Sequence, residues 1–135
     1  MSYTPNTDQW IKIATKTFTD FSTAGATNTI ASGYSLPAKS IVTGCQVIAT
    51  TLFSGGTVAS YTVSVGIGSG GSIAKYAIAT NVFTGATLAA PNVLPGIEST
   101  SAAVSITLTA TATVGLLNAA TAGSVDIYLR VGQLS

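Results

Sequence analysis

Hydrophobic and polar residues alternate along several stretches of this chain, most regularly from Ala102 to Val114. Nearly every second residue there is apolar, and most of the residues between are Ser or Thr. A period of two predicts a β-strand with one buried face and one solvent-facing face. The solvent-facing side of this strand carries hydroxyl groups rather than charged groups, and the same is true of the other alternating stretches of the chain.

The same alternation predicts further strands, separated by glycine, proline and serine. The expected strands are residues 10–19, 27–34, 40–53, 57–68, 73–83, 101–114 and 124–133, with a further short strand near 87–89 and one helical turn at 116–119. Seven or eight short strands of this kind are typical of an all-β, single-domain β-sandwich, and we expect a jelly-roll-like one. Residues 1–9 are predicted to form an irregular N-terminal arm, and residues 10–135 the sandwich domain.

Composition indicates that this domain meets other protein surfaces. The 135 residues are 47% hydrophobic but only 7% charged, with a formal net charge of +1. About a quarter of the residues are charged in an average soluble protein, and so low a share gives a lone monomer little protection against association. We therefore expect copies of the chain to cover part of its surface, with a homotrimer as the expected assembly.

Charge distribution and the first residues narrow the class of partner. The chain has no basic stripe, so a nucleic-acid partner is not expected. It has no cationic amphipathic helix or long apolar run, so a membrane partner is not expected either. The first residues lack the basic and apolar regions of a secretory signal, and we expect the protein to be made and used without export by that route.

Residues that could carry catalysis are few. The chain contains no histidine, so we expect no metal, no cofactor and no enzymatic activity. A glycosidase requires two facing carboxylates, and folding could bring Asp20 and Glu98 together because both lie in expected loops. Nothing in the sequence indicates that it does, so these two and the other carboxylates, Asp8 and Asp126, are expected to be exposed and solvated. The single cysteine, Cys45, lies in an apolar run and is interpreted as a buried, inert thiol.

Two groups of side chains are candidates for contacts. Asp126 and Arg130 lie four apart in one expected strand and therefore on one face, where they could join an ion-pair ladder with Lys75 on a neighbouring strand. Tyr3, Pro5 and Trp10 could pin the arm to the body of the fold or dock on a partner. We take them as candidate partner-contact residues, because Trp and Tyr are frequent in interface hot spots.

Four segments of the chain resemble a group of small tailed-bacteriophage virion proteins, in which a string similar to the last segment ends the chain. These segments are Phe53-Ser54-Gly55-Gly56, Tyr61-Thr62-Val63-Ser64-Val65-Gly66-Ile67, Lys75-Tyr76-Ala77 and Ala122-Gly123-Ser124-Val125-Asp126-Ile127-Tyr128. The resemblance spans most of the chain after the first strand and includes no catalytic signature. Such proteins commonly serve as capsid decoration, or cement, proteins on the outer surface of the head, often as trimers.

The resemblance implies a non-enzymatic virion protein, made in the host cytoplasm, that stabilises the phage head by bridging major capsid subunits. The alternative is a receptor- or carbohydrate-binding module of a phage tail or fibre. Clustered aromatics on one loop end would favour that alternative, and the expected loop at 88–99 has none. A glycan hydrolase would require paired carboxylates in a cleft, and a bacterial surface or pilus subunit would be expected to carry a signal peptide.

Overall fold

Strands dominate the part of the chain that the computed structural model describes, residues 9–68, 73–83 and 103–133. The elements are β1 (Gln9–Thr17), α1 (Phe18–Phe21), β2 (Thr27–Leu36), β3 (Ser40–Ser54), β4 (Ser60–Gly66), β5 (Ala77–Asn81), β6 (Val104–Thr113), the 3-10 turn η1 (Leu117–Ala119) and β7 (Ala122–Gln133). Apart from Gln9, which begins β1, the expected arm lies outside the described residues, as does the short strand expected near 87–89.

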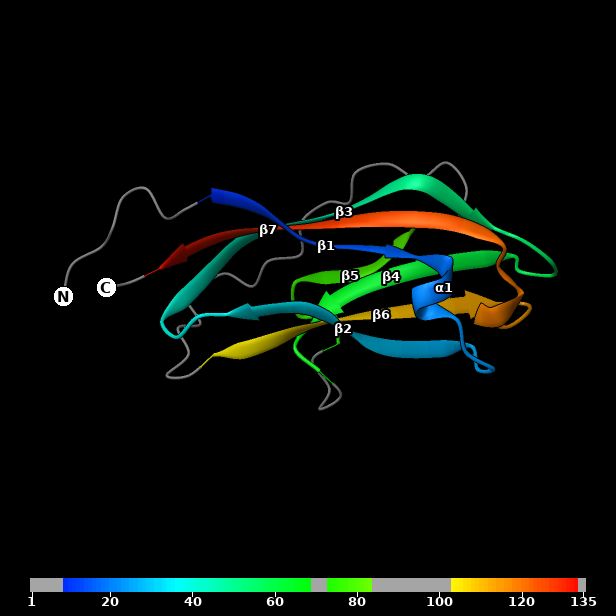
Figure 1. The fold of residues 1–135 in the computed structure, drawn as a ribbon, viewed down its shortest axis with the longest axis horizontal. Coiled ribbons are helices and arrows are strands. Elements are labelled where there is room, and N and C mark those ends of the chain that lie inside the picture. Colours follow the sequence, from blue (N-terminus) through cyan, green and yellow to red (C-terminus); the bar gives the residue numbers. More distant parts are fainter. Residues whose placement is uncertain (1–8, 69–72, 84–102, 134–135) are drawn as a thin grey trace.

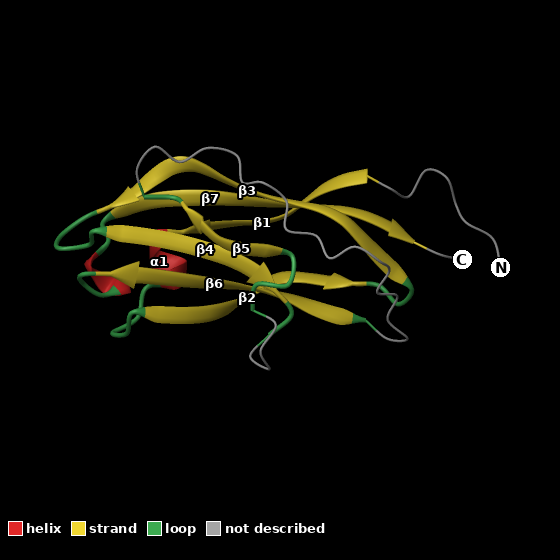
Figure 2. Ribbon diagram, turned by 180° about the vertical axis from the view of Figure 1, so that it is seen from behind, coloured by secondary structure: helices red, strands yellow, loops and turns green. Residues whose placement is uncertain are grey.

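The strands form two stacked antiparallel sheets, one with the order β1-β7-β3 and the other with the order β2-β6-β4-β5 (Figures 1 and 2). Strand β1 pairs with β7, β2 pairs with β6, and β4 pairs with β5. This nesting of early strands against late ones is the jelly-roll arrangement. The predicted all-β sandwich is confirmed.

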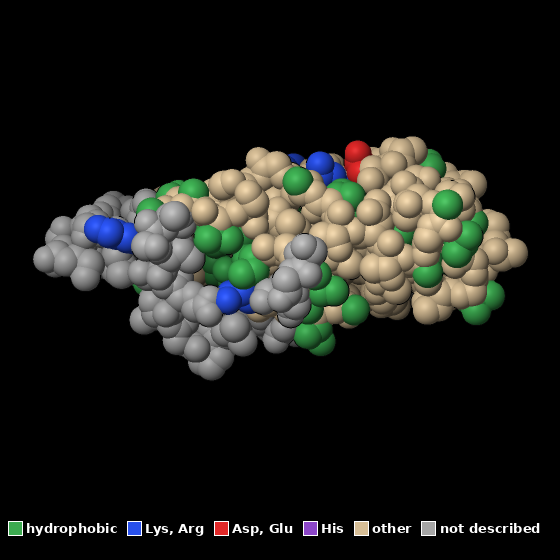
Figure 3. Space-filling view, turned by 90° about the horizontal axis from the view of Figure 1, so that it is seen from below, with side chains coloured by type: hydrophobic (Ala, Val, Ile, Leu, Met, Phe, Trp, Pro, Cys, Tyr) green, Lys and Arg blue, Asp and Glu red, His purple; other side chains and the backbone are tan. Residues whose placement is uncertain are grey.

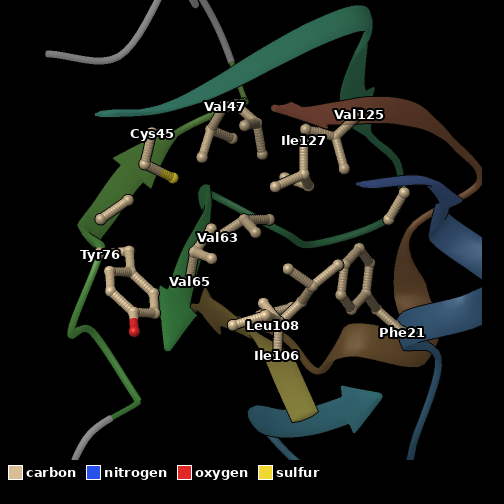
Figure 4. Packing of buried hydrophobic residues seen from close by; sticks show 14 of the residues in the cluster. Phe21, Cys45, Val47, Val63, Val65, Tyr76, Ile106, Leu108, Val125 and Ile127 are labelled. Carbon is tan, nitrogen blue, oxygen red and sulfur yellow. The ribbon is translucent and has the colours of Figure 1, made fainter. Parts of the chain in front are cut away.

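The core lies between the sheets and follows the predicted alternation closely. On β7 the four side chains expected to point inward, Val125, Ile127, Leu129 and Val131, are all buried. They face side chains of the second sheet, among them Leu108 of β6 (Figure 4). Alternation correctly predicted which side chains of these strands point into the core, because each strand has one solvent-facing side and one buried side.

The alternation fails in β1, where a β-bulge changes the side to which the later residues point. Strict alternation places Ile11, Ile13, Thr15 and Thr17 on one face. The pairing with β7 shifts register between Lys12 and Ala14, so Thr15 and Thr17 lie on the same outer face as Trp10. A bulge inserts one extra residue, which reverses the facing of everything after it.

The first strand also ends earlier than predicted, because the chain turns into α1 after Thr17. The backbone N–H of Thr17 donates a hydrogen bond of 2.8 Å to Oδ2 of Asp20, which closes this turn. The ring of Phe21 is fully buried, with its centroid 6.3 Å from that of Phe53 and 6.4 Å from that of Tyr61. An isolated helix of this length is unstable in water, so this packing holds α1 in place.

Tyr61 leaves a polar group unpaired inside the core. Its ring is fully buried and stacks on Phe53, with 4.4 Å between centroids. Its hydroxyl finds no hydrogen-bond partner within the described part of the chain, and burial raises its pKa. A buried unsatisfied hydroxyl costs about 1–3 kcal/mol.

We therefore expect Tyr61→Phe to raise the free energy of unfolding by about 1 kcal/mol, because it removes the unpaired hydroxyl and keeps the ring. Urea denaturation followed by circular dichroism measures the change. Tyr128→Phe, at a half-buried position, is the matched control and should leave the midpoint unchanged. A clear loss of stability in Tyr61→Phe alone would mean that the hydroxyl is paired in solution.

Candidate functional site

The outer face of the β1-β7-β3 sheet gathers the aromatic and charged side chains that the sequence singled out. We call it the Trp10 face and define it by its cross-strand rows. These are Trp10–Arg130–Gly44, Lys12–Tyr128–Gln46, Thr15–Asp126–Ile48 and Thr17–Ser124–Thr51, each written from β1 across β7 to β3. The face therefore grades from aromatic and cationic at one end to hydroxyl groups at the other.

Trp10 is the most prominent side chain on this face and is 45% exposed. Its indole reaches across the central strand to β3, because a Cβ added at Gly44 would lie 2.7 Å from Cη2 and 3.1 Å from Cζ2 of the ring. Such a Cβ would also lie 3.3 Å from Cβ of Arg130. Because Gly44 has no side chain, the indole of Trp10 can pack against its backbone, beside Cβ of Arg130.

The charged groups of β7 lie on the predicted face, but their surroundings differ from the prediction. Asp126 and Arg130 both point outward, and Lys12 of β1 pairs with the residue between them. The hydroxyl of Thr15 donates a hydrogen bond of 2.7 Å to Oδ1 of Asp126. The expected ladder with Lys75 is wrong, because Lys75 lies just before β5, in the sheet that does not contain β7.

The other candidate residues divide into those that the structure places and those that it does not. Tyr3, Pro5, Asp8 and Glu98 lie outside the described residues, so the position of Glu98 relative to Asp20 is not described. Within residues 9–68, 73–83 and 103–133, no group of three or more His, Cys, Asp and Glu side chains is placed to hold a metal ion. In the same segments, no helix is long and apolar enough to cross a membrane.

Cys45 lies on the inner face of β3, opposite Leu129 of β7, and is fully buried (Figure 4). Burial raises the pKa of its thiol to about 12. The reactive form of cysteine is the thiolate, so both the solvent exclusion and the pKa keep this group unreactive. The interpretation of Cys45 as a buried, inert thiol agrees with this placement.

We expect Cys45 to resist alkylation by iodoacetamide in the native protein at pH 8 and to react after unfolding in urea. Free cysteine has a pKa of about 8.5, so above that pH the unfolded state loses a proton that the folded state keeps. Stability is then lost as pH rises from about 8.5 toward about 12. Urea titrations at pH 8.5 and 10 should show a smaller loss in Cys45→Ala than in the wild type. Rapid native alkylation, or an equal loss in both proteins, would contradict the burial.

The role of Gly44 was not foreseen, although the sequence carries a signal for it. Gly44 interrupts the apolar run Ile41-Val42-Thr43-Gly44-Cys45, and an isolated glycine inside a strand pattern indicates a bulge or a close approach to the backbone. The sequence pattern does not show which side chain packs against Gly44. Trp10 reaches this position only because β1 and β3 flank β7 in the sheet.

Comparison with known proteins gives one structural likeness. No family model matches the chain, and no curated protein matches it. A solved structure described as the acidic stable capsid structure of Helicobacter pylori bacteriophage KHP30 aligns with 94% of this chain and 98% of that chain, at 12% sequence identity and a TM-score of 0.37. A likeness of this size carries no weight about function.

Proposed function

We propose that this chain is a non-enzymatic structural protein of a phage virion, a capsid decoration protein that lies on the outer surface of the head and bridges major capsid subunits. The resemblance of its segments to small phage virion proteins supports this role. Two of the side chains that could have served catalysis have structural positions instead. Asp20 caps α1, and Cys45 is buried in the core. A protein of this kind acts through the surfaces it covers.

The observation that carries the proposal is the half-exposed indole of Trp10 on a rigid sheet. Large side chains that are already held in place lose little entropy on binding, and Trp, Tyr and Arg dominate interface hot spots. Trp10 and Arg130 are direct cross-strand neighbours, and Gly44 fixes where the ring lies. The Trp10 face therefore suits the capsid contact, with major capsid protein as the partner.

The test measures binding to phage heads assembled without this protein, by co-sedimentation of the labelled chain. We expect Trp10→Ala to weaken binding by at least about 30-fold, the effect of losing a hot spot of about 2 kcal/mol. Gly44→Ala retains the indole but moves it, because the new Cβ would overlap Cη2 at 2.7 Å. That variant should also weaken binding, by a smaller factor.

Leu116→Ala provides the matched control, since Leu116 is 43% exposed and lies just before η1, at the end of the sandwich away from the start of β1 (Figure 1). It removes a similarly exposed apolar group and should bind heads as the wild type does. Failure of the wild-type chain to bind heads would overturn the proposal. Equal binding by Trp10→Ala and the wild type would remove the Trp10 face from it.

A carbohydrate- or receptor-binding module of a tail or fibre is the second candidate. An exposed indole beside the polar side chains of Arg130 and Gln46 is also the chemistry that stacks on and hydrogen-bonds a sugar ring. Binding of the chain to glycans of the host surface, lost in Trp10→Ala, with no binding to heads, would favour this candidate over the capsid role.

A further inference from the structure

Positive charge lies at one end of the Trp10 face. Lys12 of β1 and Arg130 of β7 occupy adjacent cross-strand rows beside Trp10, and both side chains are exposed. Among the described residues the ammonium of Lys12 has no carboxylate partner, and the carboxylate of Asp126, in the next row, accepts a hydrogen bond from Thr15. A surface that covers Trp10 therefore also covers two cations.

The opposite side of the sandwich differs in chemistry from the Trp10 face. Figure 3 views the molecule from the side of β2 and β6, and in the right half of that view the described surface is mainly uncharged and polar. Charged side chains lie there only along its upper edge. The combination of an indole with two cations on the Trp10 face has no counterpart on that part of the described surface.

A partner that covers the Trp10 face has to satisfy these two charges. An ammonium or guanidinium group that loses its water without gaining a counter-charge opposes binding strongly. The indole of Trp10 lies beside both groups, and a partner packed on it excludes water from their surroundings. The lower effective dielectric constant that results strengthens an ion pair with a carboxylate. Negative charge on the partner is thus the arrangement in which the apolar and the charged contacts both favour binding.

We propose that the surface of the major capsid protein that covers the Trp10 face is acidic, with carboxylate side chains opposite Lys12 and Arg130. This inference rests on the proposed function, which supplies the partner. The guanidinium of Arg130 can bind a carboxylate through two parallel hydrogen bonds. Two cations are too few for the other anionic partners, since DNA-binding proteins neutralise about 6–10 phosphates and membrane-binding segments carry about 4–8 basic residues.

Asp126 fixes the orientation in which an acidic surface can dock. Its carboxylate lies in the row of Thr15, on the side of Lys12 that is away from Trp10. A carboxylate of the partner placed opposite Asp126 would be repelled, whereas one placed opposite Lys12 and Arg130 is attracted. The acidic group of the partner therefore belongs at the Trp10 end of the face, and uncharged or basic surface belongs at the other end.

Co-sedimentation of charge variants with phage heads assembled without this protein tests the inference. Lys12→Gln should weaken binding by at least about 10-fold, Lys12→Glu should weaken it by at least about 100-fold, and Lys12→Arg should bind within about threefold of the wild type. Binding of the wild type should fall by about 10-fold between about 50 mM and about 500 mM NaCl, and that of Lys12→Gln by less. The matched control is Lys16→Glu on the same strand. Lys16 pairs with the inward-pointing Val125, so this variant should bind as the wild type does.

Three results overturn the inference: binding by Lys12→Glu that equals that of the wild type, an equal loss in Lys16→Glu, and wild-type binding that does not change with salt. If circular dichroism shows that Lys12→Glu is unfolded, Lys12→Gln and Lys12→Arg carry the test. Heads that bind the wild type and Lys12→Glu equally but bind Trp10→Ala weakly would remove only the acidic partner surface and leave the capsid role. A wild type that binds no heads would remove the capsid role, and this inference with it.

Discussion

Gly123→Ala should lower the free energy of unfolding by about 2–5 kcal/mol, a large part of the stability of a domain that has about 5–15 kcal/mol in total. A Cβ at this position would lie within 2.7 Å of three ring carbons of Phe53, which is fully buried. Overpacking a core costs about 1–3 kcal/mol. Gly123 also has φ +144, and residues with a side chain pay roughly 1–2 kcal/mol for left-handed backbone.

Two other glycines separate these causes when their alanine variants are unfolded in urea beside Gly123→Ala. Gly33 has φ +89 but nothing within 4 Å of its added Cβ, so Gly33→Ala should show the backbone cost alone. Gly25, whose nearest neighbour would lie at 3.7 Å, should tolerate alanine. In a Phe53→Leu background the smaller side chain should reduce the cost of Gly123→Ala. Equal costs at all three glycines would contradict the clash with Phe53.

Phe21→Ala should cost about 3–5 kcal/mol, the range for removing a fully buried phenylalanine. Phe21 projects from α1 into the space between the sheets (Figure 4) and contacts both Phe53 and Tyr61. Its removal leaves a cavity at that end of the core. It also removes the packing that holds α1, because the bond from Thr17 to Asp20 is too weak to do so alone.

Phe18→Ala is the matched control, since it removes the same side chain from the same short helix. Phe18 is only partly buried, so its loss should cost clearly less than that of Phe21. Thermal and urea unfolding of both variants, followed by tryptophan fluorescence and circular dichroism, measure the difference. A similar loss in the two variants would mean that α1 is held by its local structure rather than by the burial of Phe21.

Three of the strands with regular alternation could be predicted from the sequence to within about three residues at each end. The expected strands at 40–53, 101–114 and 124–133 correspond to β3, β6 and β7, and the helical turn expected at 116–119 corresponds to η1. The strands expected at 57–68 and 73–83 are longer than β4 (Ser60–Gly66) and β5 (Ala77–Asn81), and the alternation expected in β1 is interrupted by a local event. The bulge after Lys12 and the turn into α1 depend on contacts with β7 and with the core, which no local pattern contains.

The candidate surfaces were predictable only in part, for a related reason. Composition indicated a neutral, hydroxyl-rich exterior, and Trp10 was a candidate from its type and position. That most of the Ser and Thr residues of β2, β6 and β4 point to one side of their sheet follows from the strand pairing, as does the meeting of Trp10 with Gly44. Pairings between strands that are far apart in sequence decide both surfaces, and periodicity within one strand does not report them.

The central place of β7 between β1 and β3 has a consequence for synthesis of the protein. A ribosome adds about 5–20 residues per second, so roughly 5–20 s separate the emergence of β1 from that of β7. Throughout that interval the nascent chain presents the apolar sides of both flanking strands without the strand that joins them. Chaperones that hold emerging chains are therefore expected to engage it, and heat-stressed cells depleted of them should accumulate it as aggregates.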